Sequence, residues 1–278
     1  MNYRHAYHAG NFADVLKHVV ETGVLEHLKR KEAPLFYLDT HAGRGRYRRD
    51  DPAMQQGKEF LTGVMRVLAA QRAPALVARY LELVTAGNTP AFELASYPGS
   101  PLLAQALLRA DDRAAVCELE PGELALLRQA LGRDSRFHLH QRDGYEALGA
   151  LLPPRERRGL VLIDPPYEDP AEFSRLADGL RTALARWPSG AVLAWYPLAR
   201  RGGAAGFLRN CRAELTRPAL VAELLLRPAD SPVGMYGAGV LLINPPYQLD
   251  AGLAEALPWL AGALGPQARS RLDWLVRE

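Results

Sequence analysis

The chain is poor in cysteine and contains no long apolar run, and each scarcity excludes a class of protein. Its two cysteines, Cys117 and Cys211, are too few for a disulfide scaffold in 278 residues and lack metal-binding spacing. No uncharged apolar segment approaches the roughly 20 residues that a membrane-spanning helix needs. The N-terminus lacks the apolar core of a signal peptide. We therefore expect a cytoplasmic protein with no membrane partner and no metal, and nothing calls for more than a monomer.

Lysine is also scarce. Of the 34 basic residues, 4 are lysines and the other 30 are arginines. Guanidinium groups bind phosphate and stack on bases, so this bias suits a nucleic-acid partner. A genome-wide preference for arginine codons explains it equally well, and the formal charge of +3 demands no such partner. With 48% hydrophobic and 23% charged residues, the chain has the composition of one large domain, or of one domain with an insertion.

Short apolar runs alternate with helical patterns along most of the chain. The alternation predicts an α/β fold with a seven-stranded, mainly parallel sheet covered on both faces. The predicted strands are residues 35–39, 114–118, 137–140, 160–164, 191–196, 219–226 and 239–244. The last two have no helix between them, which predicts a closing antiparallel hairpin. Helices are expected at 12–30, with Asn11 as N-cap, and over a final segment at 251–277.

Residues 47–97 follow a different pattern. Helical patterns at about 55–72 and 75–86 succeed one another without a strand between them. We therefore expect an inserted helical subdomain at 47–97, while residues 1–46 and 98–278 form the main domain. The next helix is expected to begin at Ser100, a good N-cap before a proline.

Residues suited to binding a ligand follow each of the first three predicted strands. The first strand runs into residues 39–45, Asp-Thr-His-Ala-Gly-Arg-Gly, whose glycines would let a ligand approach the backbone, although a tight turn is the alternative. Glu118, after the second strand, is placed to accept from both hydroxyls of a ribose; Glu120 has the alternative role of starting a helix. After the third strand, Asp143 would accept from an adenine amine and Gly144 would keep the pocket open, unless the pair is only a turn. Together they predict a nucleotide-like cofactor.

The fourth strand ends in Asp164-Pro165-Pro166-Tyr167, because prolines supply no N–H groups to a sheet. The Asp164 carboxylate and the Pro165 carbonyl would accept from both N–H groups of an adenine amine and favour its nucleophilic form. Tyr167 offers a ring on which an extruded base stacks, worth roughly 1–3 kcal/mol. This pattern indicates methyl transfer from a donor held beside the amine. We interpret the similar residues 244–247, Asn-Pro-Pro-Tyr, as a packing turn.

The order of these motifs resembles that of S-adenosylmethionine-dependent amino-methyltransferases with a [DNS]PP[YFW] motif. The chain is more particularly similar to the RlmJ family of bacterial 23S ribosomal RNA (adenine-2030-N6) methyltransferases, from residue 1 to about 250. The segments that carry this likeness are residues 3–18, 38–43, 97–101 and 163–167. The resemblance implies a Rossmann-like class I methyltransferase fold, S-adenosyl-L-methionine as cofactor without a metal, and 23S ribosomal RNA as partner.

The resemblance also implies roles for individual residues. Asp164 would be the catalytic acceptor, with Pro165 and Tyr167 beside the substrate base and Tyr3 of the N-terminal tail on the substrate side. The residues implied to line the cofactor site are His18, His41, Ser100, Glu118, Asp143, Gly144 and Asp164.

A cluster of arginines follows the cofactor loop, and it consists of Arg44, Arg46, Arg48 and Arg49. These side chains would hold RNA phosphates, or they form only the solvated start of the insertion. An adenine inside a duplex must in any case be flipped out before it reaches the pocket.

Two other functions compete with RNA adenine-N6 methylation. A DNA adenine-N6 methyltransferase would use the same pocket, although no DNA-reading module is recognisable. A non-catalytic nucleic-acid-binding protein on a methyltransferase fold would have no need of Asp164, so the presence of this carboxylate favours an enzyme.

Overall fold

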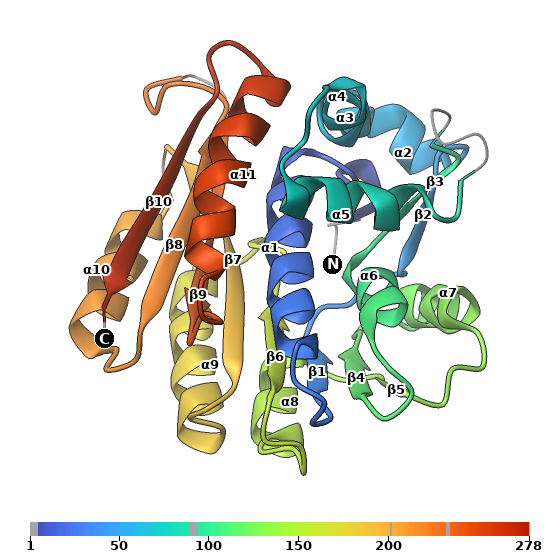
Figure 1. The fold of residues 1–278 in the computed structure, drawn as a ribbon, viewed down its shortest axis with the longest axis vertical. Helices are drawn as coiled ribbons and strands as arrows, with labels where there is room; N and C mark the ends of the chain where they lie inside the picture. Colours follow the sequence, from blue (N-terminus) through green and yellow to red (C-terminus); the bar gives the residue numbers. More distant parts are fainter. Residues whose placement is uncertain (1–4, 89–93, 201, 232–233, 278) are drawn as a thin grey trace.

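A mainly parallel sheet of eight strands runs through the computed structural model, which describes residues 5–88, 94–200, 202–231 and 234–277 (Figure 1). The strand order is β10-β8-β9-β7-β6-β1-β4-β5. The strands are β1 (Phe36–Asp39), β4 (Arg113–Cys117), β5 (Phe137–His140), β6 (Gly159–Ile163), β7 (Ala191–Ala199), β8 (Ala219–Leu225), β9 (Met235–Ile243) and β10 (Arg269–Val276). Because β1 pairs in parallel with both β4 and β6, the carboxyl ends of these strands meet at one edge.

The expected antiparallel pair at the end of the chain is confirmed, but an eighth strand follows it. Strand β9 lies antiparallel between β7 and β8, and β10 is antiparallel to β8. The prediction of a helix through residue 277 is wrong, because α11 (Leu249–Leu264) ends at Gly265. Beyond it, residues 269–274 alternate between exposed and half-buried positions, which is the period of a strand.

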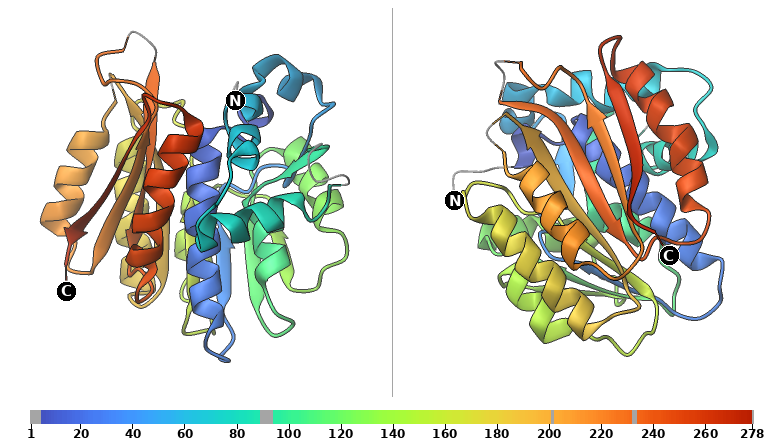
Figure 2. Two further views of the ribbon diagram at one scale, coloured as in Figure 1. Left: turned by 45° about the horizontal axis from the view of Figure 1, so that its top comes forward. Right: turned by 90° about the vertical axis from the view of Figure 1, so that its left-hand side faces the viewer.

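Helices cover both faces of the sheet (Figure 2). Side chains from β1 alternate between the two hydrophobic cores, since Tyr37 enters one core while Phe36 and Leu38 enter the other. The Tyr37 face is covered by α1 (Phe12–Lys29), α6 (Ser100–Leu107), α7 (Pro121–Leu131) and α11. The opposite face is covered by α8 (Gly144–Leu151), α9 (Glu172–Arg186) and α10 (Ala204–Glu214).

Helix α1 is buried over most of its length although it carries charged residues. It follows a short 3-10 helix, η1 (His5–Tyr7), and begins as predicted, with the Asn11 side chain accepting from the N–H groups of Ala13 and Asp14 at 2.9 Å. Its buried polar residues are Asp14, Lys17, His18, Glu21 and Thr22. Buried charges need groups of opposite charge or hydrogen-bond partners, so the charged side chains of α1 are expected to contact such groups at the edge of the sheet.

The insertion begins and ends in two short strands that were not predicted, β2 (Arg46–Arg48) and β3 (Ser96–Pro98), which pair antiparallel. Between them lie α2 (Pro52–Gly57), α3 (Glu59–Thr62), α4 (Val64–Ala69) and α5 (Ala75–Thr85). The helical pattern expected at 55–72 is broken at Lys58, whose φ is 51°, and at Gly63. A Cβ on Gly63 would lie 2.2 Å from the Gly10 carbonyl oxygen. The insertion shares one core with α1, and its status as a subdomain stays a prediction.

Candidate active site

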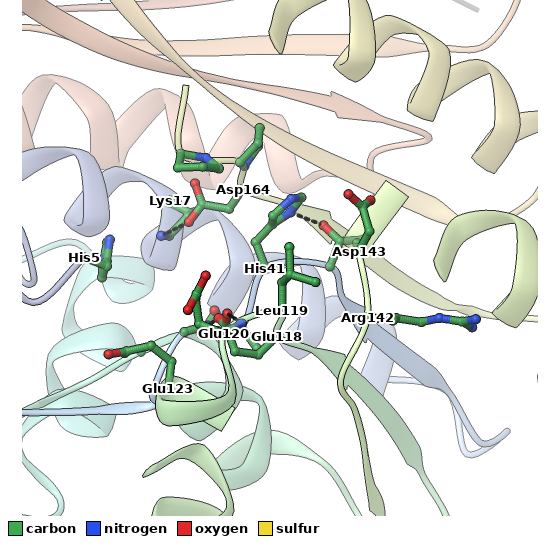
Figure 3. Close-up of a pocket in the computed structure, with 18 of the residues that line it drawn as sticks. His5, Lys17, His41, Glu118, Leu119, Glu120, Glu123, Arg142, Asp143 and Asp164 are labelled. Atoms are coloured by element: carbon green, nitrogen blue, oxygen red, sulfur yellow. Dashed lines mark hydrogen bonds and ion pairs between the residues drawn. The ribbon is translucent and has the colours of Figure 1, made fainter. Parts of the chain in front are cut away.

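A cavity opens where the carboxyl ends of β1, β4, β5 and β6 meet (Figure 3). Its wall consists of the loops after these strands, one side of α1 and the start of α6. The residues predicted to line the cofactor site all border this cavity, and they are His18, His41, Ser100, Glu118, Asp143, Gly144 and Asp164. The fold therefore brings together residues that lie up to 146 positions apart in the sequence. Which group of a cofactor each one contacts stays a prediction.

The loop after β1 has a shape that glycine adopts most readily. Gly43 has a φ of +60°, and a Cβ there would lie 2.4 Å from the Tyr47 hydroxyl oxygen. The Gly43 N–H donates to Glu118 Oε2 at 2.9 Å, and the Glu120 N–H donates to Glu118 Oε1 at 2.8 Å. Burial raises the pKa of Glu118 above its ordinary value. Glu118 thus ties the loop to β4 while it faces the cavity, whereas Glu120 is an exposed residue at the rim.

Ser100 borders the cavity but does not cap α6, so that prediction is wrong. Gly99 is the N-cap residue, and the Ser100 hydroxyl donates to Asp39 Oδ2 at 2.7 Å. Asp39 is fully buried and also accepts from the Tyr37 hydroxyl and the His41 N–H. Burial raises the pKa of Asp39 to about 6. A buried carboxylate needs hydrogen-bond donors, so the Ser100 hydroxyl donates to Asp39 and does not cap the helix.

Asp143 and Gly144 join α8 to the loop after β1. Asp143 Oδ1 accepts from the Tyr145 N–H at 2.8 Å and caps α8, while Oδ2 accepts from Arg175 at 2.9 Å. A Cβ on Gly144 would lie 2.1 Å from the Thr40 carbonyl oxygen, so no larger residue fits without a shift of the backbone. The carboxylate is therefore held in a fixed orientation at the cavity wall.

Asp164 is held by a lysine that sequence analysis did not assign to the chemistry. Lys17 Nζ lies 2.5 Å from Asp164 Oδ2 and 2.9 Å from Asp14 Oδ1 (Figure 3). Asp14 also accepts from the Gly10 N–H at 2.9 Å and lies 3.0 Å from His5 Nε2. Although burial lowers it, the pKa of Lys17 is held well above its ordinary value by the two carboxylates. A buried cation thus fixes one oxygen of Asp164, and within the described ranges Oδ1 has no protein hydrogen bond.

The only sequence signal for this cluster was the spacing of Asp14 and Lys17, which are three residues apart on one helix and therefore lie on the same side. The contact between Lys17 and Asp164 joins residues 147 positions apart. No local pattern records such a contact.

A second cavity adjoins the first at Asp164. His5, Lys17, Asp164 and Pro166 border both. The apolar part of the second cavity's lining consists of Tyr167, Phe173, Trp195, Pro197, Ala199 and Met235, and the charged Glu168, Asp169 and Arg200 also border it. Asp164 therefore lies between two spaces, as a residue that acts on two ligands at once must.

The residues predicted to contact the substrate have different positions. Pro165 borders the first cavity and Tyr167 the second. The Tyr167 hydroxyl donates to the Trp195 carbonyl oxygen at 2.9 Å, and its ring centroid lies 4.9 Å from that of Phe173. Tyr3 lies outside the described residues.

The similar motif at residues 244–247 lies at the opposite edge of the sheet, because β9 runs antiparallel to β7. The Asn244 side chain donates to the carbonyl oxygens of Pro188 and Gly190, at 3.0 and 2.8 Å. These contacts agree with its interpretation as a packing turn.

The four clustered arginines divide into two groups. Arg44 forms ion pairs with Glu123 and Asp51, and the nitrogen–oxygen distance is 2.6 Å in each. In β2 the side chains alternate, so Tyr47 is buried towards the first cavity while its neighbours are exposed. The arginines that border a hollow on the outer surface of this hairpin are Arg46, Arg48 and Arg49.

The remaining expectations concern disulfides, metal sites and membrane-spanning helices. Both cysteines are free and buried. Within the described ranges, no group of three or more histidine, cysteine or acidic residues has a geometry suited to a metal ion. No helix in these ranges is both long and apolar enough to cross a membrane.

The topology, with a cavity at the carboxyl edge of the sheet, is that of a Rossmann-like class I methyltransferase. A family model described as "Ribosomal RNA large subunit methyltransferase D, RlmJ" matches residues 32–276, and the chain belongs to this family. Two curated relatives named ribosomal RNA large subunit methyltransferase J, from Escherichia coli K12 and Haemophilus influenzae, are each 38% identical over 280 residues, with full coverage of both chains.

A crystal structure of a Legionella pneumophila protein has a similar fold, with a TM-score of 0.89 and 34% identity over 96% of this chain and 98% of that one. The predicted family and fold class are confirmed. The protein is a ribosomal RNA methyltransferase with S-adenosylmethionine as its cofactor.

Proposed function

We propose that the protein methylates the exocyclic N6 of one adenine in 23S ribosomal RNA, the adenine known as 2030 in the family. The observation that carries the proposal is the position of Asp164, which lies between two adjoining cavities with one oxygen fixed by Lys17. When bound, S-adenosylmethionine supplies an electrophilic methyl group. Asp164 and the Pro165 carbonyl accept from the adenine amine and orient its lone pair towards that methyl group.

The reaction requires little more than orientation. With S-adenosylmethionine bound, N6 would gain the methyl group as the carbon–sulfur bond breaks, and the amine would release one proton to solvent. The charged Lys17 holds Asp164 in place, so the carboxylate keeps its position as an acceptor throughout. Correct placement of two reactants supplies much of the rate enhancement in such a reaction.

We assign the first cavity to the cofactor. Glu118 would accept from the ribose hydroxyls and Asp143 from the adenine amine of the cofactor. Gly99 and Ser100 begin an eight-residue helix, whose N-terminus favours the negative charge of a carboxylate. His18, His41 and Gly144 complete the wall.

We assign the second cavity to the flipped target adenine. Tyr167 and Trp195 supply aromatic surface there, and aromatic stacking is worth roughly 1–3 kcal/mol per base. Tyr3 would approach the base from the N-terminal tail. Arg46, Arg48 and Arg49 present exposed guanidinium groups on the outside of β2, where they would contact RNA phosphates. Such a substrate implies a cytoplasmic enzyme, and we propose that it acts as a monomer.

The test is to incubate the protein with tritiated S-adenosylmethionine and, separately, with protein-free 23S RNA and with genomic DNA. We expect label in the RNA alone. Label in the DNA alone would overturn the choice of RNA, and label in neither would contradict transfer to free nucleic acid altogether.

A further inference from the structure

Two histidines border the cofactor cavity, and both are neutral at physiological pH. Burial, and then the cationic Lys17, lowers the pKa of His18 well below its ordinary value. Burial lowers the pKa of His41 to about 4. A neutral imidazole has one N–H and one acceptor nitrogen, so its neighbours decide which nitrogen faces the cavity as donor.

The tautomer of His18 follows from a chain of two buried tyrosine hydroxyls. His18 Nδ1 lies 2.7 Å from the Tyr97 hydroxyl oxygen, which lies 3.0 Å from that of Tyr80. Tyr80 and Tyr97 are fully buried, and among the residues that the structure describes the Tyr80 hydroxyl has no partner except Tyr97. If Tyr80 donates to Tyr97 and Tyr97 donates to Nδ1, both hydroxyl protons have acceptors.

The reverse direction would leave the Tyr80 proton without an acceptor in an apolar core. An unsatisfied buried donor costs about 1–3 kcal/mol. The first direction is therefore favoured, and it puts the ring proton of His18 on Nε2. Because Nδ1 is occupied by Tyr97, Nε2 is the nitrogen that remains for a ligand in the cavity.

The tautomer of His41 is fixed in the opposite sense. The Thr40 hydroxyl oxygen lies 3.0 Å from the Leu162 carbonyl oxygen and 2.7 Å from His41 Nδ1. The Leu162 carbonyl oxygen, which also accepts from the Thr40 N–H at 3.0 Å, has no proton of its own. If the Thr40 hydroxyl donated to His41, two oxygens would lie 3.0 Å apart with no proton between them, so the hydroxyl proton goes to Leu162. His41 Nδ1 must then donate to Thr40, which leaves Nε2 as an acceptor.

We propose that Tyr97, supported by Tyr80, and Thr40 are positioning residues that hold the two cavity histidines in opposite tautomers. His18 presents a donor to S-adenosylmethionine and His41 presents an acceptor. His18 donates to the cofactor carboxylate, because Tyr97 connects it to the segment that begins α6 at Gly99 and Ser100. His41 accepts from an N–H or O–H group of the same molecule. The assignment rests on our placement of the cofactor in this cavity.

A donor at His18 and an acceptor at His41 would distinguish the two ends of the cofactor. S-adenosylmethionine has a single carboxylate, while its donors are an ammonium, two ribose hydroxyls and the adenine amine. A reversed cofactor would set donors against donors at His18, an arrangement that leaves buried polar groups unpaired. The insertion contributes to this selection, because Tyr80 lies on α5 and Tyr97 on β3.

The first test is nitrogen-15 NMR of the full-length protein with labelled histidine at neutral pH, which shows which ring nitrogen carries the proton. We expect the proton of His18 on Nε2 and that of His41 on Nδ1, with and without S-adenosylhomocysteine. The same tautomer at both residues, or the opposite pair, would overturn the proposal. The measurement uses no RNA, so its result is independent of the choice between RNA and DNA as substrate.

The second test is calorimetric binding of S-adenosylmethionine and of its decarboxylated analogue. Tyr97→Phe should raise the Kd of S-adenosylmethionine about tenfold, the size of one buried hydrogen bond, and leave that of the analogue within about twofold. Thr40→Val should weaken both ligands alike, because every cofactor donor is retained in the analogue. Equal losses for both ligands in Tyr97→Phe would overturn the carboxylate assignment.

The matched control is Tyr196→Phe, which removes a buried tyrosine hydroxyl on β7 that donates to Glu223. It should lower the free energy of unfolding without changing either Kd. A change in cofactor affinity as large as that of Tyr97→Phe would show that any lost tyrosine hydrogen bond has this effect and would contradict the assigned role.

Discussion

At the scale of single residues, Lys17 is the group on which the orientation of Asp164 depends. Its side chain is 5% exposed and lies between two carboxylates, so removal of its charge would leave Asp14 and Asp164 facing each other without a cation. Breaking a buried pair of this kind costs about 3–5 kcal/mol, partly in stability and partly in the orientation of what remains.

We predict that Lys17→Met lowers kcat by at least about tenfold and changes the Kd of S-adenosylmethionine by less than about threefold. The physical reason is that Asp164 loses its fixed position, whereas Glu118 and Asp143, which we assign to the ribose and adenine of the cofactor, do not contact Lys17. Steady-state kinetics on 23S RNA and calorimetry measure the two quantities. A Lys17→Met protein with the wild-type kcat would contradict this role.

The meeting of the site residues at one cavity was predictable because topology brings them together. Glu118, Asp143 and Asp164 each follow a strand of a parallel sheet, and parallel strands end at one edge whatever the lengths of their connections. Lys17 was not predictable in this way, since it reaches Asp164 from a helix that precedes the sheet. Ser100 was placed correctly at the cavity, but its hydrogen bond was not foreseen because the acceptor, Asp39, is 61 positions away.

At the scale of elements, α1 contains a buried acid that destabilises the fold. Glu21 is fully buried, its Oε1 lies 2.8 Å from the Tyr37 hydroxyl oxygen, and its Oε2 has no hydrogen-bond partner among the described residues. Burial and the nearby Asp39 raise the pKa of Glu21 well above its ordinary value. A raised carboxyl pKa means that stability present below the unfolded pKa is lost as the pH rises through the folded one.

We predict that Glu21→Gln makes the free energy of unfolding less dependent on pH. The stability of the wild type relative to this variant should fall by at least about 1.4 kcal/mol between pH 5 and pH 9, which corresponds to one pKa unit. Urea unfolding at both pH values measures it. The control is Glu26 on the same helix, which is half-buried and paired with Arg79, since Glu26→Gln should change stability by less than about 1 kcal/mol. A constant difference for Glu21→Gln would contradict the buried-acid explanation.

The hairpin of β2 and β3 is the element that we expect to hold RNA phosphates. The double variant Arg46→Gln/Arg49→Gln should weaken RNA binding at every sequence and reduce the slope of log K against log salt by about 2, one for each lost phosphate contact. Fluorescence anisotropy at several salt concentrations measures both quantities. Cofactor affinity should not change, because these side chains face away from the cavity.

Arginines on α10 provide a matched control for the hairpin. Arg209→Gln/Arg212→Gln removes two exposed charges from the opposite face of the sheet. The salt slope should remain that of the wild type. If both double variants reduce the slope equally, binding depends on total charge and the hairpin has no special role.

Two elements show why sequence patterns were insufficient. Residues 271–274 alternate polar and apolar side chains after the break at Gly265 and Pro266, so a short strand signal was present but was interpreted as the end of a helix. The short strands β2 and β3 gave no usable signal, because they are three residues long and their pairing joins residues about 50 positions apart. The seven predicted strands, which are longer and mostly apolar, all occur.

At the scale of the whole molecule, strand direction places the two similar motifs at opposite edges of the sheet. Residues 164–167 follow a parallel strand and lie between two cavities, whereas residues 244–247 follow an antiparallel strand and lie at the other edge. The same four-residue pattern thus has a proposed catalytic role at one edge and a packing role at the other. The insertion shares its core with α1, so the hairpin of β2 and β3 and the helix that carries Lys17 belong to one packed unit.

The measurement that tests the central claim most directly is mass spectrometry of the nucleosides from unmodified 23S RNA after incubation with S-adenosylmethionine and the wild type, Asp164→Ala or Asn244→Ala. The account predicts N6-methyladenosine from the wild type and from Asn244→Ala, and none from Asp164→Ala, although that variant still binds the cofactor. A methyl group on another atom, full activity of Asp164→Ala, or an equally deep loss in Asn244→Ala would contradict it.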